Sequence, residues 1–371
     1  MAWSFQIGRL FGIPIRVHLT FFLLLAFFAL PAGAKGGPMA GLARALFICA
    51  LFFCVVLHEL GHSLVARKYG VGVESITLLP IGGVSAMERI PDEPRQEFGI
   101  SVAGPLVSLG VAVVLGAAIY AVGGRQELLS MQILSLEGGW WGIGFFRNLM
   151  WTNVLLAIFN MLPAFPMDGG RVLRSVLAQR MDYVRATHIA ASVGQAAAFA
   201  LGFLGLLGNP WLILIALFVY LGAGQEEKQV RVRSLLRSVP VQAAMVSQFQ
   251  VLSPYNTLEQ AVHYASLGYQ ADFPVVDNER LVGMVTRQAM ISGLHERGPW
   301  ERVGGVMETD FCVVGPGESL TDIYDRLARG KCPIAAVVSD NTVVGIVTPE
   351  SIQNYMMLAA TPQGPPRPYG H

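Results

Sequence analysis

The stretch Ala45–Leu57 contains no charged residue, and it is followed directly by His58-Glu59-Leu60-Gly61-His62. Ionisable side chains are costly inside a bilayer and are rarely kept there without a function. Positions i and i+4 share one face of a helix, so His58 and His62 can bind one metal ion together. Glu59 then stands where a general base could take a proton from water. The segment therefore predicts a membrane helix that carries two ligands of a metal site.

The composition separates a membrane part from a soluble part. Of the 371 residues, 53% are hydrophobic and 14% are charged, which is typical of a membrane protein. Six apolar segments precede residue 225, each near the ~17–25 residues that cross a bilayer, although the first, fourth and last are short. They are residues 18–31, 41–67, 97–122, 149–166, 187–208 and 210–224. A net charge of +1 leaves no basic stripe for phosphates, which argues against a nucleic-acid partner.

Basic residues indicate how these segments are oriented. Six crossings place both chain termini on one side of the membrane, and most arginines and lysines of the loops fall on that side. The positive-inside rule then makes both termini cytoplasmic, in a bacterial-type inner membrane. The first segment has an alternative interpretation, because it ends in Ala32-Gly33-Ala34, which imitates a signal-peptide cleavage site. Such a leader would be long, so we favour a retained helix.

Residues 70–90 alternate like a pair of strands, which predicts a small β-hairpin inserted between two membrane helices. Such a hairpin either lies on the cytoplasmic surface or offers an open strand edge to an extended peptide. We favour the open edge. Gly82 and Gly83 are then candidate contacts for the substrate or for an oxyanion.

A third metal ligand is needed, because a catalytic zinc has three protein ligands and one open position. Asp168 is the best candidate, since it follows the fourth apolar segment at the same predicted depth as the two histidines. Prolines and glycines around it break the helix, and broken backbone at membrane depth can line a wet cavity. The alternative is that Asp168 only caps the following helix. Asn160, before the break, either donates to the oxyanion of the reaction or bonds another helix.

The chain after the apolar part contains an internal repeat. A shift of 62 positions carries Met245 onto Met307, Gly283 onto Gly345 and Thr286 onto Thr348. Each unit reads as a short helix, a strand, a helix, two strands and a final helix. We expect a membrane domain, a linker, two repeats and a disordered tail, at residues 1–225, 226–242, 243–300, 303–358 and 359–371.

The four cysteines are Cys49, Cys54, Cys312 and Cys332. Their spacing fits neither a disulfide framework nor a metal site. We expect all four to be small buried residues with free thiols.

The His-Glu-Leu-Gly-His helix and the stretch Asn160–Arg174 together resemble the site-2 protease family of intramembrane zinc metallopeptidases. Ala103-Gly104-Pro105-Leu106 and the Gly82-Gly83 strand also look like features of that family. The resemblance covers roughly residues 1–225. It implies that His58, His62 and Asp168 bind one Zn²⁺ and that Glu59 is catalytic. It also implies a single-pass membrane-protein substrate, such as an anti-sigma factor or a membrane-tethered transcription factor.

The repeat pair resembles cystathionine-β-synthase-type (CBS) domains, with Gly283–Thr286 and Gly345–Thr348 as the recurring strand motif. Proteases with this attachment resemble the sporulation-type branch of the family. The resemblance implies an adenine nucleotide, ATP or AMP, near Thr286 and Thr348, or a homo-oligomer formed through the CBS domains. The sequence departs from the nucleotide-binding pattern, because Ala289 and Ser351 stand where the ribose-binding acid is expected. Ligand sensing and dimerisation both stay open.

The sequence therefore predicts a polytopic α-helical membrane domain followed by an α/β pair of CBS domains. The predicted function is regulated intramembrane proteolysis by a zinc metalloendopeptidase. The alternative is a CBS-regulated ion transporter or channel, which would be expected to show internal symmetry among its membrane helices. No such repeat is visible among residues 1–225.

Overall fold

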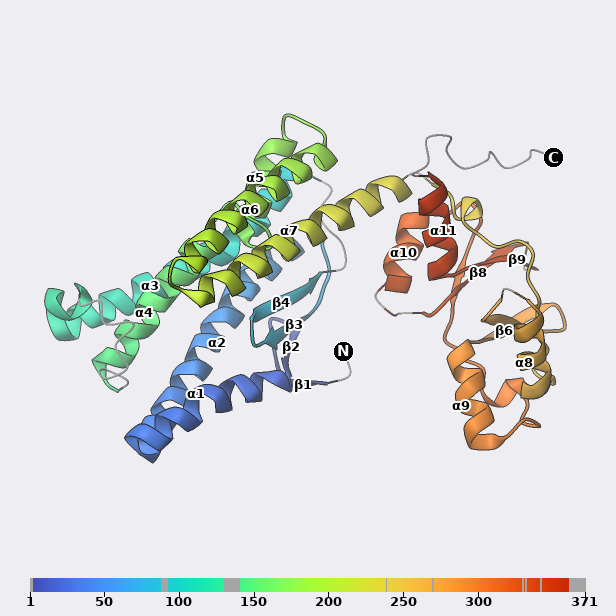
Figure 1. Cartoon of the computed structure of the whole chain (residues 1–371), viewed down its shortest axis with the longest axis horizontal. Coiled ribbons are helices and arrows are strands. Elements are labelled where there is room, and N and C mark those ends of the chain that lie inside the picture. The colour runs from blue at the N-terminus through green and yellow to red at the C-terminus, as the bar shows by residue number, and fades with distance from the viewer. Residues whose placement is uncertain are drawn as a thin grey trace. The chain divides into compact units, whose positions relative to one another are not determined.

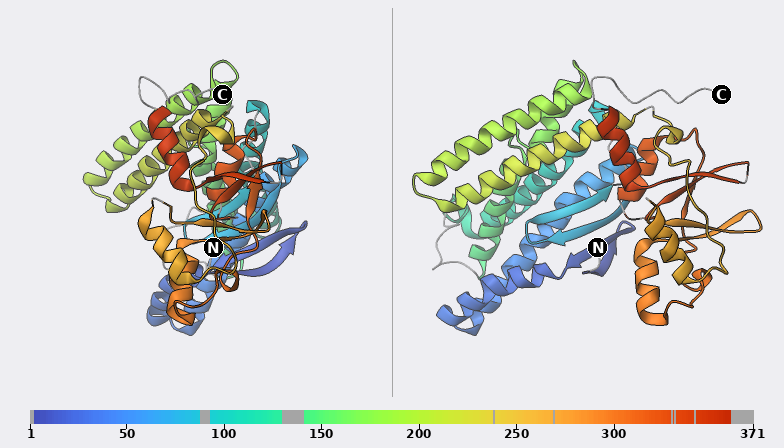
Figure 2. Two further views of the ribbon diagram at one scale, coloured as in Figure 1. Left: turned by 90° about the vertical axis from the view of Figure 1, so that its right-hand side faces the viewer. Right: turned by 45° about the vertical axis from the view of Figure 1, so that its right-hand side comes forward.

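The computed structural model forms two compact units, which divide between Lys228 and Gln229. Figures 1 and 2 show the helices and strands of both. The predicted tail lies, from residue 360 onward, outside the described residues. The structure describes residues 3–87, 93–129, 141–237, 239–268, 270–328, 330, 332–340 and 342–359.

Each of the six predicted apolar segments corresponds to one helix, and all six helices begin in the first unit. These helices are α1 (Thr20–Gly36), α2 (Pro38–Lys68), α3 (Pro94–Leu129), α4 (Ile143–Asn160), α6 (Tyr183–Leu206) and α7 (Pro210–Leu236). Among the described residues, α2, residues 94–123 of α3, and α6 are long and apolar enough to cross a membrane. Large apolar side chains such as Val113 and Phe199 are exposed on these helices, as contact with lipid requires.

Several helix ends differ from the prediction, and two of these differences have a clear cause or consequence. The fourth segment was expected to run to residue 166, but α4 ends at Asn160, because the two prolines that follow cannot continue a helix. The last segment was expected to end at residue 224, but α7 continues to Leu236 and takes in most of the predicted linker.

A four-stranded sheet packs against α2 (Figure 1), and its strand order is β1-β2-β3-β4. The strands are β1 (Ser4–Leu10), β2 (Ile13–His18), β3 (Val73–Leu79) and β4 (Gly82–Met87). β3 and β4 are the predicted hairpin, whereas β1 and β2 were not predicted. β2 runs parallel to β3, and the α1–α2 pair connects them. The buried residues of β2 are Ile13, Ile15 and Val17, which belong to one core with residues of α1 and α2.

The second unit contains the two predicted repeats. The first comprises α8 (Leu258–Leu267), β5 (Phe273–Asp277), β6 (Arg280–Val285) and α9 (Arg287–Arg297). The second comprises β7 (Cys312–Val314), α10 (Leu320–Ala328), β8 (Ala335–Ser339), β9 (Thr342–Val347) and α11 (Pro349–Ala359). Short 3-10 turns precede them at η1 (Val241–Ala243) and η2 (Val303–Gly305). Figure 2 shows the matching hairpins β5–β6 and β8–β9, and a β-bulge recurs at the same repeat position in both.

The first segment of each repeat pairs with the last strand of the other repeat's hairpin. Val246 pairs with Ile346, and Glu308, 62 positions after Val246, pairs with Met284. The repeated methionines and glycines are partners in this exchange. A Cβ atom on Gly345 would lie 2.9 Å from Met245 Sδ, and one on Gly283 would lie 2.7 Å from Met307 Sδ. Each repeat thus supplies a segment that pairs with the other, and the pair forms one compact unit.

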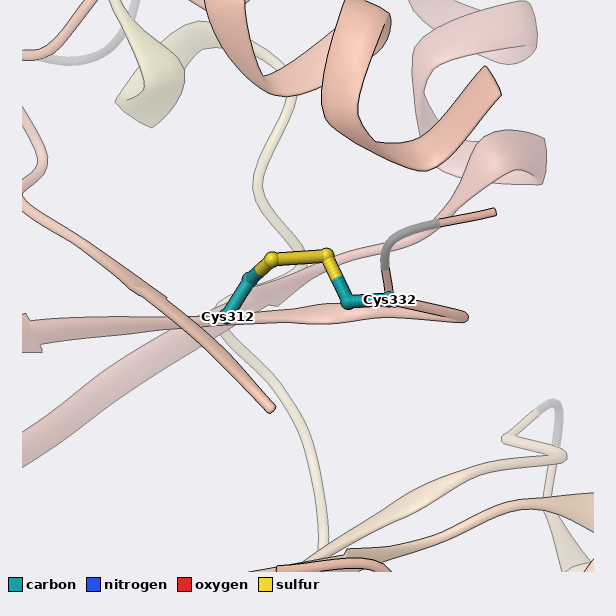
Figure 3. Close-up of a disulfide and its surroundings, with 2 residues drawn as sticks. All are labelled: Cys312 and Cys332. Atoms are coloured by element: carbon teal, nitrogen blue, oxygen red, sulfur yellow. A yellow bond between two sulfur atoms is a disulfide. The ribbon is translucent and has the colours of Figure 1, made fainter. Parts of the chain in front are cut away.

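Cys312 and Cys332 form a disulfide (Figure 3), so the expectation of four free thiols is wrong for these two residues. Cys312 lies in β7, which pairs with β8 just after Cys332. The strand pairing brings their Cα atoms to 5.9 Å, although 20 positions separate them in sequence. Cys49 and Cys54 are free, and of these only Cys54 is buried as expected.

Alkylation of the unfolded, unreduced protein is expected to label two cysteines, and four after reduction, as counted by mass spectrometry. Closing a loop of this length stabilises a fold by about 3 kcal/mol, so Cys332→Ser should lower the unfolding free energy of the second unit by that order. Cys49→Ser, at an exposed free cysteine, is the matched control and should be neutral. Four labelled cysteines before reduction would contradict the disulfide.

Candidate metal centre

His58, His62 and Asp168 bring one ligand atom each to a common point. The Nε2 atoms of the two histidines lie 3.1 Å apart, and each lies 3.2 Å from Asp168 Oδ2. All three ligand atoms lie within 4.8 Å of one another, and both imidazoles are buried. The histidines come from α2, whereas Asp168 is the first residue of α5 (Asp168–Ala178). The three predicted ligands therefore meet in the folded chain.

Hydrogen bonds behind the two rings determine which nitrogen faces the cluster. His62 Nδ1 lies 2.6 Å from the backbone oxygen of Ile100, which can only accept. Nδ1 therefore carries the proton, and the lone pair of Nε2 points to the cluster. His58 Nδ1 lies 2.9 Å from Ser108 Oγ, which can accept in the same way. Both partners belong to α3, so this helix orients both imidazoles.

Gly104 lies on α3 against the same two ligand nitrogens. A Cβ atom at this position would collide with His62 Nε2 and would lie 2.7 Å from His58 Nε2. Gly61 makes a similar close approach from α2, where a Cβ atom would lie 3.0 Å from the backbone oxygen of Ala103. Small residues at these positions let α2 and α3 pack closely. Gly104 also keeps side-chain atoms away from the ligand nitrogens.

The donor set fits zinc. Two imidazole nitrogens and one carboxylate oxygen are the ligands of many catalytic zinc sites, which keep a fourth position for water. Each histidine has a hydrogen-bond partner behind it, as zinc-binding histidines almost always do. The residues present therefore fit one Zn²⁺ ion.

The chain around Asp168 is folded tightly. Met167 occupies the N-cap of α5 and Asp168 the first helical position, so the carboxylate that contacts both histidines is not the cap residue. A Cβ atom on Gly169 would collide with the backbone oxygen of Leu162, and one on Gly170 would lie 2.6 Å from the backbone nitrogen of Phe165. The two glycines after Asp168 thus let the preceding loop pack directly on the helix.

A buried charge network holds α5 in place. Arg174, which is 1% exposed, donates from Nε to Glu97 Oε1 at 2.9 Å and from Nη1 to Glu226 Oε2 at 3.2 Å. Arg171 Nη2 donates to Glu226 Oε1 at 3.2 Å. Burial lowers the pKa of Arg174, but the carboxylates of Glu97 and Glu226 raise it above its ordinary value. α5 is therefore tied to α3 and α7 by charges that are costly to separate.

Glu59 lies beside the ligand His58 and contacts β4. Its Oε2 accepts a hydrogen bond of 2.6 Å from Ser85 Oγ. A Cβ atom on Gly83 would lie 2.5 Å from Glu59 Cγ. β4 is an edge strand of the sheet, so the predicted Gly82-Gly83 strand places an open edge next to the predicted general base.

Two groups of predicted residues have other partners in the structure. Asn160 Nδ2 donates to the backbone oxygen of Leu156 in its own helix, at 3.0 Å, so its oxyanion role stays a prediction. Thr286 Oγ1 and Thr348 Oγ1 each accept from the backbone nitrogen three residues on, at 3.1 Å. Both threonines therefore cap the helices that follow them, and their nucleotide role stays a prediction.

Sequence reasoning missed several polar residues near these positions. Ser85 and Ser108 show no motif, although Ser108 follows Gly104 by one helical turn and so shares its helix face. In the second unit, Asp272 Oδ1 accepts from the backbone nitrogen of Arg287 at 2.8 Å. Burial raises the pKa of Asp272, and the hydrogen bond from Arg287 only partly offsets this.

Comparisons with known proteins assign the family. The model of peptidase family M50 matches residues 46–140 and 140–201, and the CBS domain model matches residues 238–296 and 303–358. Zinc metalloprotease MJ0392 of Methanocaldococcus jannaschii is 38% identical over 359 residues, which are 96% of this chain and 97% of that protein. The chain belongs to peptidase family M50. The prediction of a membrane zinc metalloprotease with a CBS pair is confirmed.

Two further proteins are similar to parts of the chain. The solved site-2 protease from Methanocaldococcus jannaschii is 40% identical, with a TM-score of 0.44, over 61% of this chain and 95% of that one. Stage IV sporulation protein FB of Bacillus subtilis is 25% identical over 173 residues, 46% of this chain and 51% of that protein. The sporulation-type relative is thus a distant one, and the family leaves the alternative of an ion transporter without support.

Gly104→Ala is expected to weaken zinc binding roughly tenfold or more, because the added methyl group occupies the space of the ligand nitrogens. Gly110→Ala is the matched control on the same helix, since a Cβ atom there meets nothing within 4 Å. Zinc content and competition with a chelator measure the difference. Equal zinc affinity in the two variants would contradict the arrangement of α2 and α3.

Proposed function

We propose that this chain is an intramembrane zinc-dependent endopeptidase. It hydrolyses a peptide bond within or near the transmembrane segment of a membrane-protein substrate. The observation that carries the proposal is the convergence of His58, His62 and Asp168, with Glu59 beside them, at helices apolar enough to cross a membrane.

The chain's own residues supply the steps around the metal. A zinc ion held by His58, His62 and Asp168 would supply Lewis acidity to water and to the substrate carbonyl. Glu59 takes the proton of the attacking water and passes it to the leaving amine. The amide of Asn160 and the backbone of Gly82-Gly83 are the proposed donors to the oxyanion.

The open edge of β4 suits an extended substrate. Peptides commonly bind exposed sheet edges by adding a strand, which gives main-chain hydrogen bonds along the edge. A strand added to β4 would pass Glu59, because Gly83 and Ser85 both contact that residue. The proposed substrate is a single-pass membrane protein, such as an anti-sigma factor or a membrane-tethered transcription factor, whose helix unwinds locally at this edge.

The distribution of basic residues supports a bacterial-type inner-membrane location with both termini cytoplasmic. The segment around Asp168 then lies toward the cytoplasmic side, since the basic residues of α5 are expected on that side. The CBS pair follows α7 and would be cytoplasmic as well.

The CBS pair is proposed to regulate the peptidase through α7. Glu226 of α7 bonds two arginines of α5, and α5 begins with the ligand Asp168. Further along α7, Arg233 Nη2 bonds Asp325 of α10 at 3.0 and 3.1 Å. The proposed ligand is ATP or AMP, and the proposed assembly is a homo-oligomer. Calorimetric titration separates the two roles, because a module that only dimerises gives no saturable heat with either nucleotide.

Glu59→Gln is expected to lower the cleavage rate by roughly 10²- to 10⁴-fold, because the amide cannot accept the proton of the attacking water. Zinc content should stay at the wild-type level, since Glu59 is not a ligand. The measurement is cleavage of a single-pass substrate by the full chain in proteoliposomes, with His58→Ala as a variant that should lose zinc. Equal cleavage by wild type and Glu59→Gln would contradict the proposed function.

Glu226→Gln is expected to lower the free energy of unfolding by about 3 kcal/mol, because it leaves the buried Arg174 with one carboxylate partner. Zinc affinity should fall with it, since α5 carries Asp168. Glu227→Gln is the matched control: Glu227 pairs with His188, whose side chain is 60% exposed, and exposed pairs contribute little. Thermal unfolding and chelator competition provide the measurements. Equal effects of the two variants would contradict the role of the network.

A further inference from the structure

The carboxylate of Glu59 is the end of a short chain of hydroxyl groups. Ser63 Oγ donates to Ser85 Oγ at 3.3 Å, and Ser85 Oγ donates to Glu59 Oε2 at 2.6 Å. The Ser85 hydroxyl accepts a hydrogen bond from Ser63 and has one proton of its own, so that proton is donated to the carboxylate of Glu59. Ser63 is fully buried on α2, one turn after Glu59. The direction of the hydrogen bonds is therefore set from the protein interior toward Glu59.

The two oxygens of the carboxylate differ in their surroundings. Oε2 is held by Ser85, whereas Oε1 has no hydrogen-bond partner among the residues that the structure describes. A glutamate side chain has several rotatable bonds, and fixing them costs entropy each time the group must be aligned. A general base has to lie within hydrogen-bond reach of the proton that it takes. Because Ser85 holds Oε2 in place, Oε1 is aligned to accept a proton.

The register of β4 explains why Ser85 reaches Glu59. Ser85 pairs with Ile76 of β3, which is fully buried in the core shared with α2. Residues two apart on a strand share a face, so Gly83 faces α2 together with Ser85. The missing side chain at Gly83 lets β4 approach Glu59 closely enough for the short bond from Ser85.

We propose that Ser85 is a positioning residue for the reaction. Its hydroxyl, oriented by Ser63, holds Oε2 of Glu59 so that Oε1 faces the attacking water. Ser85 lies on the strand whose open edge is the proposed substrate contact, so alignment of the base and binding of the peptide depend on the same strand. The inference rests on the proposed peptidase function, and it concerns the rate of the reaction rather than the binding of zinc.

The test uses the full chain in proteoliposomes with a single-pass substrate. Ser85→Ala is expected to lower kcat roughly ten- to hundredfold, because misplacement of a catalytic group by about 1 Å has an effect of that order. KM and zinc content should stay unchanged. Ser85→Thr keeps the hydroxyl on a strand position that favours threonine and should restore most of kcat. Ser75→Ala removes a hydroxyl from the neighbouring strand β3 and is the matched control.

Ser108→Ala provides the opposite pattern, since Ser108 contacts a metal ligand and its loss should weaken zinc affinity roughly 10- to 100-fold. Full kcat in Ser85→Ala would overturn the inference while leaving the peptidase intact. A fall in zinc content, a rise in KM that accounts for the loss, or no rescue by threonine would also overturn it. Absence of cleavage by the wild type, by contrast, would remove the proposed function itself.

Discussion

The nitrogens of two imidazoles in an apolar helix all need partners, and the architecture of the first unit follows from that constraint. An unpaired polar group in such surroundings costs several kcal/mol, on the order of a lost hydrogen bond or more. α3 supplies the partners of both Nδ1 atoms, through Ile100 and Ser108. Both Nε2 atoms lie 3.2 Å from Asp168 Oδ2, and a metal ion bound among these three acceptor atoms would be their common partner. α3 also approaches both ligand nitrogens closely at Gly104, so this helix contributes to the site together with the helix that carries the two histidines.

The position of Asp168 depends on interactions away from the ligand cluster. α5 is short, and its buried anchor is Arg174, which lies between the carboxylates of Glu97 and Glu226. Removing either carboxylate would leave a buried charge incompletely paired, which is far more costly than losing a surface ion pair. These ion pairs keep Asp168 in place, although the chain between α4 and α5 forms neither helix nor strand. The metal site therefore rests on a buried charge network as well as on packed helices.

The features that were predicted correctly are those that leave a pattern within a short segment or a regular repeat of the sequence. Helical spacing identified His58 and His62, the broken segment identified Asp168, and the 62-residue shift identified the repeats. The hairpin β1–β2 was missed because β2 also pairs with β3, a strand distant in sequence, and a long-range pairing of this kind leaves no local pattern. The Cys312–Cys332 bond was missed for the same reason, since strand pairing brings the two residues together. Ser85 and Ser108 have no signal in sequence, because each is defined by its distance from another element.

α7 gives the two units a covalent and helical connection. Its last residue, Leu236, is fully buried in a core with Val314 and Leu320 of the second repeat. Its Glu226 holds the arginines of α5. Ten residues of helix separate these two positions, which is about 15 Å at the rise of an α-helix. The backbone hydrogen bonds of the helix fix the spacing of these two residues along the chain, whereas the helix can still curve gently. In the proposed regulation through α7, a rearrangement of the repeats that moved Leu236 would act on Glu226, and through Arg174 on the helix that begins with Asp168.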